Sequence, residues 1–142
     1  GVPFIPREQK QIDAIARGGY VLFESESELQ VIIIATGTEV GIALEAAQQL
    51  AEQNVGVRLV SMPSAETFSM QSDDYREQVL PTAMRARLAV EAGTSDYWRK
   101  FVGIDGDVIG VDQFGASAPG PVLMKHYGFT VENIVQRAQK LI

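Results

Sequence analysis

The stretch 31–54 constrains the fold of this chain most, because it predicts a buried strand that passes directly into an amphipathic helix. Residues 31–35 are five consecutive apolar residues, three of them isoleucine, which is typical of a strand in a parallel sheet covered on both faces. After Gly37, apolar residues recur at helical spacing over 40–51. The stretch therefore predicts the central strand of an α/β domain, followed by a helix that packs on one face of the sheet.

Length and composition limit the classes of protein to which the chain can belong. With 142 residues, of which 46% are hydrophobic and 21% charged, it fits one globular domain with a core of its own. The net charge of −6 disfavours nucleic acid and anionic membrane surfaces as partners. The chain has no cysteine, which excludes disulfides and thiolate nucleophiles. No signal peptide or membrane-spanning run is visible, so we expect a cytoplasmic protein.

Four further short apolar runs predict the other strands of the sheet. These strands are expected at Tyr20–Phe23, Val57–Met62, Arg87–Glu91 and Asp107–Val111. Only residues 24–30 separate the first run from the central strand, too few for a parallel crossover, so these two strands are predicted to run antiparallel. Ser72 and Thr130 are predicted to cap helices. Residues 1–17 are expected to form an interdomain linker with a short helix, and residues 18–142 the folded domain.

The turn between the central strand and its helix is the first candidate for a binding site. Thr36 and Glu39 stand at capping-box spacing, and Thr38 is the alternative cap. The backbone N–H groups of Gly37 and Thr38 would lie at the edge where open α/β folds place ligands. The sequence matches neither a dinucleotide fingerprint nor a Walker loop. We favour plain capping, and expect any anion site at Gly37 and Thr38 to be weak, about millimolar.

Carboxylates at the predicted strand ends form a second group of candidates. Glu91, Asp96 and Asp112 stand at or near strand ends, where such a set could perform acid–base chemistry or hold a hard cation. Helix capping and loop contacts are the favoured alternative. Ser61 and Glu91 are the expected neighbours of the Gly37 turn. His126, the only histidine, has no nucleophile motif beside it, so we assign no catalytic, cofactor-binding or metal-binding residue.

A loop rich in small and apolar residues follows the last predicted strand. Residues 114–121 are too poor in polar groups for catalysis and too long for a simple turn. A loop of this kind fits burial against a neighbouring domain or a second subunit, and a plain surface loop is the alternative. The predicted interface residues are Phe114, Gly115, Ala116, Ser117, Ala118 and Pro119.

Six ordered segments of the sequence together resemble a known family, the C-terminal domain of transketolase. They are Ile34–Val40, Leu59–Ser64, Tyr75–Pro81, Val90–Gly93, Phe114–Pro119 and Tyr127–Thr130. The resemblance extends from Ala16 to the end of the chain. It implies a three-layer α/β/α domain with a mixed five-stranded sheet, mostly parallel with one antiparallel strand.

The resemblance also carries functional expectations. The family transfers a two-carbon ketol unit from a ketose phosphate to an aldose phosphate in the pentose phosphate pathway, as a homodimer. It uses thiamine diphosphate and a divalent cation, magnesium or calcium, held by two preceding domains whose cofactor and sugar-phosphate residues have no matching positions here. The leading hypothesis is a non-catalytic structural and assembly domain that binds no cofactor alone. The alternatives are a free-standing flavodoxin-like binder of a phosphorylated small molecule and a regulatory ligand-binding domain.

Overall fold

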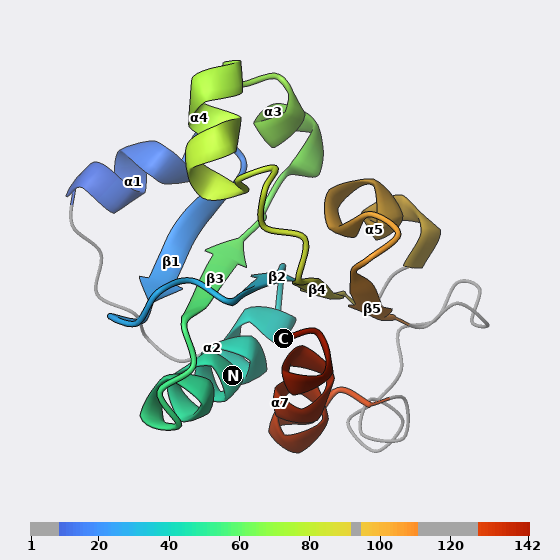
Figure 1. The fold of residues 1–142 in the computed structure, drawn as a ribbon. Helices are drawn as coiled ribbons and strands as arrows, with labels where there is room; N and C mark the ends of the chain where they lie inside the picture. Colours follow the sequence, from blue (N-terminus) through green and yellow to red (C-terminus); the bar gives the residue numbers. More distant parts are fainter. Residues whose placement is uncertain (1–8, 92–94, 111–127) are drawn as a thin grey trace.

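A mixed sheet lies between two helical layers in the computed structural model, which describes residues 9–91, 95–110 and 128–142 (Figure 1). The strands are β1 (Tyr20–Glu24), β2 (Val31–Ala35), β3 (Val57–Ser61), β4 (Arg87–Val90) and β5 (Asp107–Ile109). The helices are α1 (Gln9–Ile15), α2 (Glu39–Glu52), α3 (Ala65–Ser69), α4 (Asp73–Val79), α5 (Ser95–Val102) and α7 (Val131–Lys140). The predicted strands and fold class are confirmed.

The strand order is β1-β3-β2-β4-β5, with β2 at the centre. β2 pairs in parallel with β3 and β4, and β4 pairs in parallel with β5. β1 pairs antiparallel with β3 at one edge, so the direction predicted from the short connection to β2 is confirmed. Its hydrogen-bonded neighbour is nevertheless β3, because both sides of β2 are already occupied by parallel strands.

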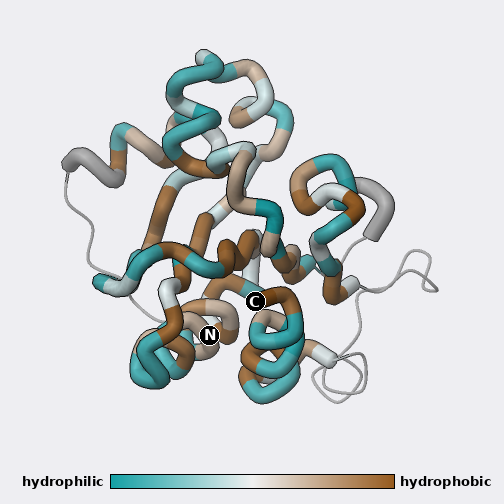
Figure 2. The backbone as a smooth tube through the Cα atoms, viewed as in Figure 1, coloured by the Kyte–Doolittle hydropathy of each residue, from teal (hydrophilic) through white to brown (hydrophobic). Residues whose placement is uncertain are grey.

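The central strand separates two hydrophobic cores. All five residues of β2 are buried, and Ile33 is 0% exposed. Val31, Ile33 and Ala35 pack with α2 and α7, whereas Ile32 and Ile34 pack with α3, α4 and α5. This alternation is what a strand with helices on both faces requires, and Figure 2 shows the apolar residues concentrated along the sheet and the inner sides of α2 and α7.

Side-chain caps begin two of the helices as predicted. The hydroxyl of Ser72 accepts a hydrogen bond from the Tyr75 N–H at 3.2 Å, and that of Thr130 from the Asn133 N–H at 3.1 Å. For α2 the N-cap is the predicted alternative, Thr38, and not Thr36, but the predicted side-chain cap is absent. Thr38 stands at the N-cap with φ −70° and ψ −17°, and its side chain makes no cap hydrogen bond, because the usual cap geometry needs an extended backbone at that residue.

Several sequence predictions concern segments that the structure does not describe. The interface loop 114–119, Asp112 and His126 lie outside the described residues. Asp96 belongs to α5, but its side chain is likewise outside the described part. The described helices include none that is long and apolar enough to cross a bilayer.

Candidate functional site

The carboxyl edge of the sheet brings the predicted turn and strand ends to one place. Ala35, the last residue of β2, is the register partner of Ser61 on β3 and of Val90 on β4. The turn at Gly37 and the residue after β4, Glu91, therefore lie at the same edge as the buried Ser61. This is the arrangement that the strand order of an open α/β sheet predicts.

The turn at the start of α2 is exposed and already carries a negative charge. Gly37 has φ +62°, a left-handed conformation that favours glycine, and both Gly37 and Thr38 are exposed. Glu39, the first residue of α2, is only 5% exposed, and its Oε1 accepts a hydrogen bond from Thr38 Oγ1 at 3.2 Å. A carboxylate here interacts favourably with the helix dipole, so it opposes a second anion at this turn.

Glu91 is the titratable group of this edge with the most altered acidity. It is half-buried, and its backbone N–H donates to the Ile109 carbonyl oxygen at 3.1 Å. Burial and, as the smaller cause, the negative charge of Glu39 together raise the pKa of Glu91 to about 7. Near neutral pH the Glu91 carboxyl group can therefore donate or accept a proton. Proton transfer is thus the chemistry that the described residues of this edge could perform. The described residues contain no group of three or more acidic or histidine side chains placed to hold a metal.

The amino edge of the sheet holds two arginines whose roles the sequence analysis missed. Arg58 on β3 and Arg87 on β4 are both register partners of Ile32 on β2. Arg58 donates to the carbonyl oxygens of Gln78 and Val79, and Arg87 donates to those of Leu80 and Pro81. The signal in the sequence was an arginine in each of two apolar strand runs. A half-buried arginine at such a position requires hydrogen-bond partners nearby.

An ion pair joins the last strand to the last helix. Arg137 Nε lies 2.5 Å from Asp107 Oδ2, and Arg137 Nη2 lies 2.7 Å from Asp107 Oδ1. The hydrogen bond from Arg137 is the largest influence that lowers the pKa of Asp107. This bidentate pair fixes α7 against β5 and is structural in character.

Comparisons with known proteins identify relatives along nearly the whole chain. The family described as "Transketolase-like TK C-terminal domain" matches residues 18–130. Transketolase 2 of Vibrio parahaemolyticus is 50% identical over 137 residues, which are 96% of this chain and 21% of that protein. A probable transketolase of Streptococcus pneumoniae is 50% identical over 129 residues, which are 91% of this chain and 20% of that protein.

Solved structures agree with these sequence matches. The transketolase from Leishmania mexicana superposes with a TM-score of 0.80 and 39% identity, covering 92% of this chain and 18% of that one. The transketolase from Campylobacter jejuni gives a TM-score of 0.76 and 32% identity, covering 89% of this chain and 19% of that one. The chain spans about a fifth of the length of the sequence relatives it matches. It belongs to the family of transketolase C-terminal domains.

Proposed function

We propose that this chain is the structural and assembly domain of a transketolase, which transfers a two-carbon ketol unit from a ketose phosphate to an aldose phosphate. The observation that carries the proposal is the 50% identity over 96% of the chain to a protein named transketolase, of which the chain spans 21%. A domain of this family serves the reaction by packing against the remainder of the enzyme. The pentose phosphate pathway and the cytoplasm are the proposed setting.

A domain replacement tests the proposal directly. The corresponding fifth of the Vibrio parahaemolyticus transketolase 2 is exchanged for this chain, and ketol transfer between sugar phosphates is measured. We expect an active chimera, because half of the residues in the exchanged part are identical. A matched chimera that carries Ile33→Asp should be inactive through loss of folding. A folded but inactive unsubstituted chimera would contradict the proposal.

The cofactors are proposed to be bound elsewhere in the enzyme. Thiamine diphosphate and a divalent cation would be held by the preceding domains, and this chain alone would bind neither. Support comes from the described arginines Arg58, Arg87 and Arg137, which are engaged with backbone carbonyls or carboxylates of the domain itself. Calorimetric titration of the chain with thiamine diphosphate and magnesium should give no saturable heat. Micromolar binding would place the cofactor site within this chain and contradict the assignment.

The partners proposed for this domain are the preceding domains and a second subunit in a homodimer. The loop Phe114–Pro119 is proposed to contribute to this contact, and residues 1–17 to be the linker. Ala116→Glu or Ala118→Glu should weaken dimers of the full-length enzyme, measured by sedimentation. The melting temperature of the domain alone should remain nearly unchanged, since the loop would contact a partner. An equal loss of stability in the domain alone would instead make the loop part of the core.

The turn at Gly37 and Thr38 remains a proposal for a weak anion site. Support comes from the exposure of both residues at the start of a helix of 14 residues, and Glu39 and Glu91 limit the affinity. We expect a dissociation constant no better than about 1 mM for phosphate, equivalent to about 4 kcal/mol. Amide shift titrations with phosphate and FMN test this. Tight, localised shifts at Gly37 would favour a flavodoxin-like binder.

A further inference from the structure

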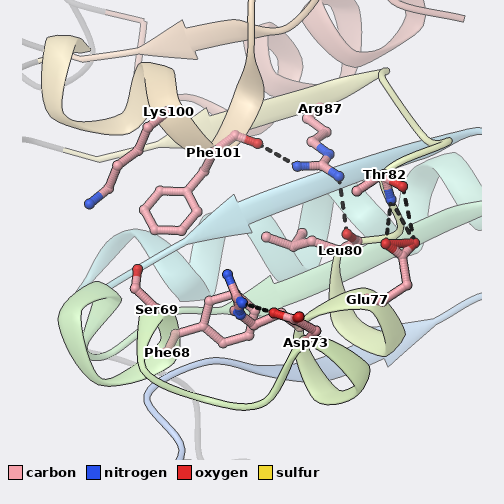
Figure 3. A pocket seen from close by; sticks show the side chains of 10 residues that line it. Phe68, Ser69, Asp73, Glu77, Leu80, Thr82, Arg87, Lys100 and Phe101 are labelled. Carbon is pink, nitrogen blue, oxygen red and sulfur yellow. Dashed lines mark hydrogen bonds and ion pairs between the residues drawn. The ribbon is translucent and has the colours of Figure 1, made fainter.

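The helices α4 and α5 are joined closely to the sheet, whereas α1 leaves part of its apolar surface uncovered. Figure 3 shows Arg87 on β4 donating hydrogen bonds to the backbone oxygens of Leu80 and Phe101, at 3.2 and 2.6 Å. The Phe101 side chain is itself only 8% exposed. The two isoleucines of α1 are less protected, because Ile12 is 50% exposed and Ile15 is half-buried. α1 therefore carries apolar side chains that the described part of the domain does not fully cover.

The junction between α1 and β1 is fixed, although the helix itself is not fully packed. The guanidinium carbon of Arg17 lies 4.7 Å from the centroid of the Tyr75 ring, and the Tyr75 hydroxyl donates to the Gly19 carbonyl oxygen at 2.7 Å. Gly18 has φ +87°, and a side chain there would collide with the backbone of the α3 segment. These contacts with α3 and α4 set the direction in which α1 leaves the domain.

Helical geometry turns Ile12 away from its own domain. α1 lies beside the edge strand β1 (Figure 1), and a cleft of about 330 Å³ separates it from α4. Ala14 lines this cleft. Successive residues of a helix are about 100° apart, so Ile12 and Ala14 lie on opposite sides, whereas Ile12 and Ile15 are neighbours on one side. The two isoleucines therefore form the outward side of α1.

The comparisons place α1 between the domain and the remainder of the related enzymes. The matched family domain begins at residue 18, so α1 precedes it. The match to the Vibrio parahaemolyticus protein includes 137 of the 142 residues, which leaves too few outside it to exclude α1. The chain covers only 21% of that protein, and the family is described as a C-terminal domain. The remainder of such an enzyme would therefore enter this domain through α1.

We propose that the outward side of α1, formed by Ile12 and Ile15, is a docking surface for an apolar patch on the preceding domain of the same transketolase chain. The inference rests on the proposed function, because its partner is the remainder of that enzyme. Docking would remove apolar side chains from water, which is the main favourable contribution to protein association. The fixed junction at Gly18 would present the helix in one orientation, so residues 9–15 act as a docked helix within the linker.

Amide hydrogen exchange of α1 in two contexts tests the inference. Peptides that contain residues 12–17 are followed by mass spectrometry in the isolated chain and in the full-length chimera with the Vibrio parahaemolyticus enzyme. We expect exchange about tenfold slower in the chimera, because docking would hold α1 in its helical form. Equal exchange in both contexts, in a chimera that is active in ketol transfer, would overturn the inference and leave the proposed function intact. Slower exchange in a folded but inactive chimera would support docking and contradict the proposed function.

Two matched truncations show whether the outward side of α1 makes the contact. In the chimera, Ile12→Ala should speed the exchange of α1 about threefold, because it removes apolar area that docking buries. Alanine favours the helix more than isoleucine does, so faster exchange would not come from a weakened helix. Ile104→Ala makes the same change at a 95% exposed residue before β5, at the other edge of the sheet, and should leave the exchange of α1 unchanged. No effect of Ile12→Ala, or equal effects of both variants, would overturn the inference.

The isolated chain shows whether a second copy, and not the preceding domain, covers α1. The exchange of α1 in the isolated chain should be independent of protein concentration, because the partner is absent. Slower exchange at higher concentration, reversed by Ile12→Ala, would identify a second copy as the occupant and overturn the choice of partner.

Discussion

At the amino edge of the sheet two arginines flank Ile32, whereas at the carboxyl edge two glutamates follow the ends of the neighbouring strands β2 and β4. The arginines are tied to the end of α4 by backbone carbonyl oxygens. The glutamates face each other as like charges, and the described residues include no cation paired with either. The same three central strands thus carry stabilised charge at one edge and mutually repelling charge at the other.

The amino edge owes its stability to the match between strand and helix. The last carbonyl groups of a helix lack partners within the helix and carry partial negative charge. Arg58 and Arg87 supply donors and positive charge to the end of α4, and Arg58 also pairs with Glu24, with Nε 2.8 Å from Oε1. Hydrogen bonds from a charged donor are stronger than neutral ones, so this edge is a structural joint between the sheet and α4.

The carboxyl edge shows the opposite arrangement. Burial and the neighbouring Glu39 both disfavour the charged form of Glu91, which raises its pKa to about 7. Glu39 is itself buried, with a hydrogen bond from Thr38 as its side-chain contact. Groups with such perturbed acidity cluster at functional sites and interfaces. The difference therefore teaches that the carboxyl edge is where the charge of the sheet changes near neutral pH, whereas the amino edge keeps a fixed, hydrogen-bonded charge.

The largest expected effect comes from a substitution in β2 that disrupts both edges at once, since both depend on this strand. Ile33 is 0% exposed, and Ile33→Asp would place a carboxylate there without a partner. The cost is several kcal/mol, on the order of the whole free energy of unfolding of a domain. We expect no soluble, cooperatively melting protein by circular dichroism. Ile104→Asp, at a residue that is 95% exposed, is the control and should melt like the parent protein; a well-folded Ile33→Asp variant would refute the central-strand assignment.

The next effect tests the joint at the amino edge. Arg87→Met keeps the long apolar stem but removes every hydrogen bond of the guanidinium to carbonyl oxygens, so we expect a loss of about 2–4 kcal/mol in the free energy of unfolding. Urea denaturation measures this loss. Arg85→Met is the matched control, because its side chain is 79% exposed and forms one ion pair at 3.2 Å with Asp105. Similar losses of stability in both variants would show that the hydrogen bonds of Arg87 to carbonyl oxygens contribute no more than the exposed ion pair of Arg85.

A smaller effect, opposite in sign, is expected at the carboxyl edge. The pKa of Glu91 is raised in the folded state, so the folded protein holds this proton more tightly than the unfolded chain. Its stabilising contribution is complete below about pH 4 and is lost as the pH rises towards about 7. Glu91→Gln removes the titrating group, so the variant does not lose this stability as the pH rises. The variant should therefore be more stable than the parent protein at pH 8, by about 1 kcal/mol after allowance for solvent access.

Thermal melts between pH 4 and pH 8 measure this effect. Glu45→Gln makes the same change on the exposed side of α2 and should retain the pH dependence of the parent protein. If Glu91→Gln also retains it, the unfavourable charge at the carboxyl edge does not arise from Glu91.

The strands were predictable from the sequence because their signal is local. The run 31–35 is apolar at every position, and its burial on both faces follows from that pattern alone. The joint at the amino edge was not predictable, because Gln78 and Arg58 are adjacent only after α4 has folded back over the sheet. The pKa of Glu91 likewise depends on Glu39, which is distant in sequence and close in space.

The helix caps show, at single residues, the same limit on what can be predicted from the sequence. Ser72, Thr130 and Thr38 all precede helices and all have a hydroxyl group, yet only the first two accept the capping hydrogen bond. The distinction lies in the backbone at the N-cap, which is extended at Thr130 and helical at Thr38. Residue type therefore predicted that a helix begins, but not how its first N–H groups are satisfied.

The smallest expected effect follows from that difference and sharpens the description of the carboxyl edge. Thr38→Ala removes a hydroxyl that makes no cap bond, so the free energy of unfolding should change by less than about 0.5 kcal/mol. Ser72→Ala removes a hydroxyl that accepts from the Tyr75 N–H, and should cost about 1 kcal/mol. Urea denaturation of both variants under one set of conditions makes the comparison. A loss at Thr38 equal to that at Ser72 would mean that the hydroxyl stabilises the start of α2 through its hydrogen bond to Glu39, which would make this edge a structural joint like the other.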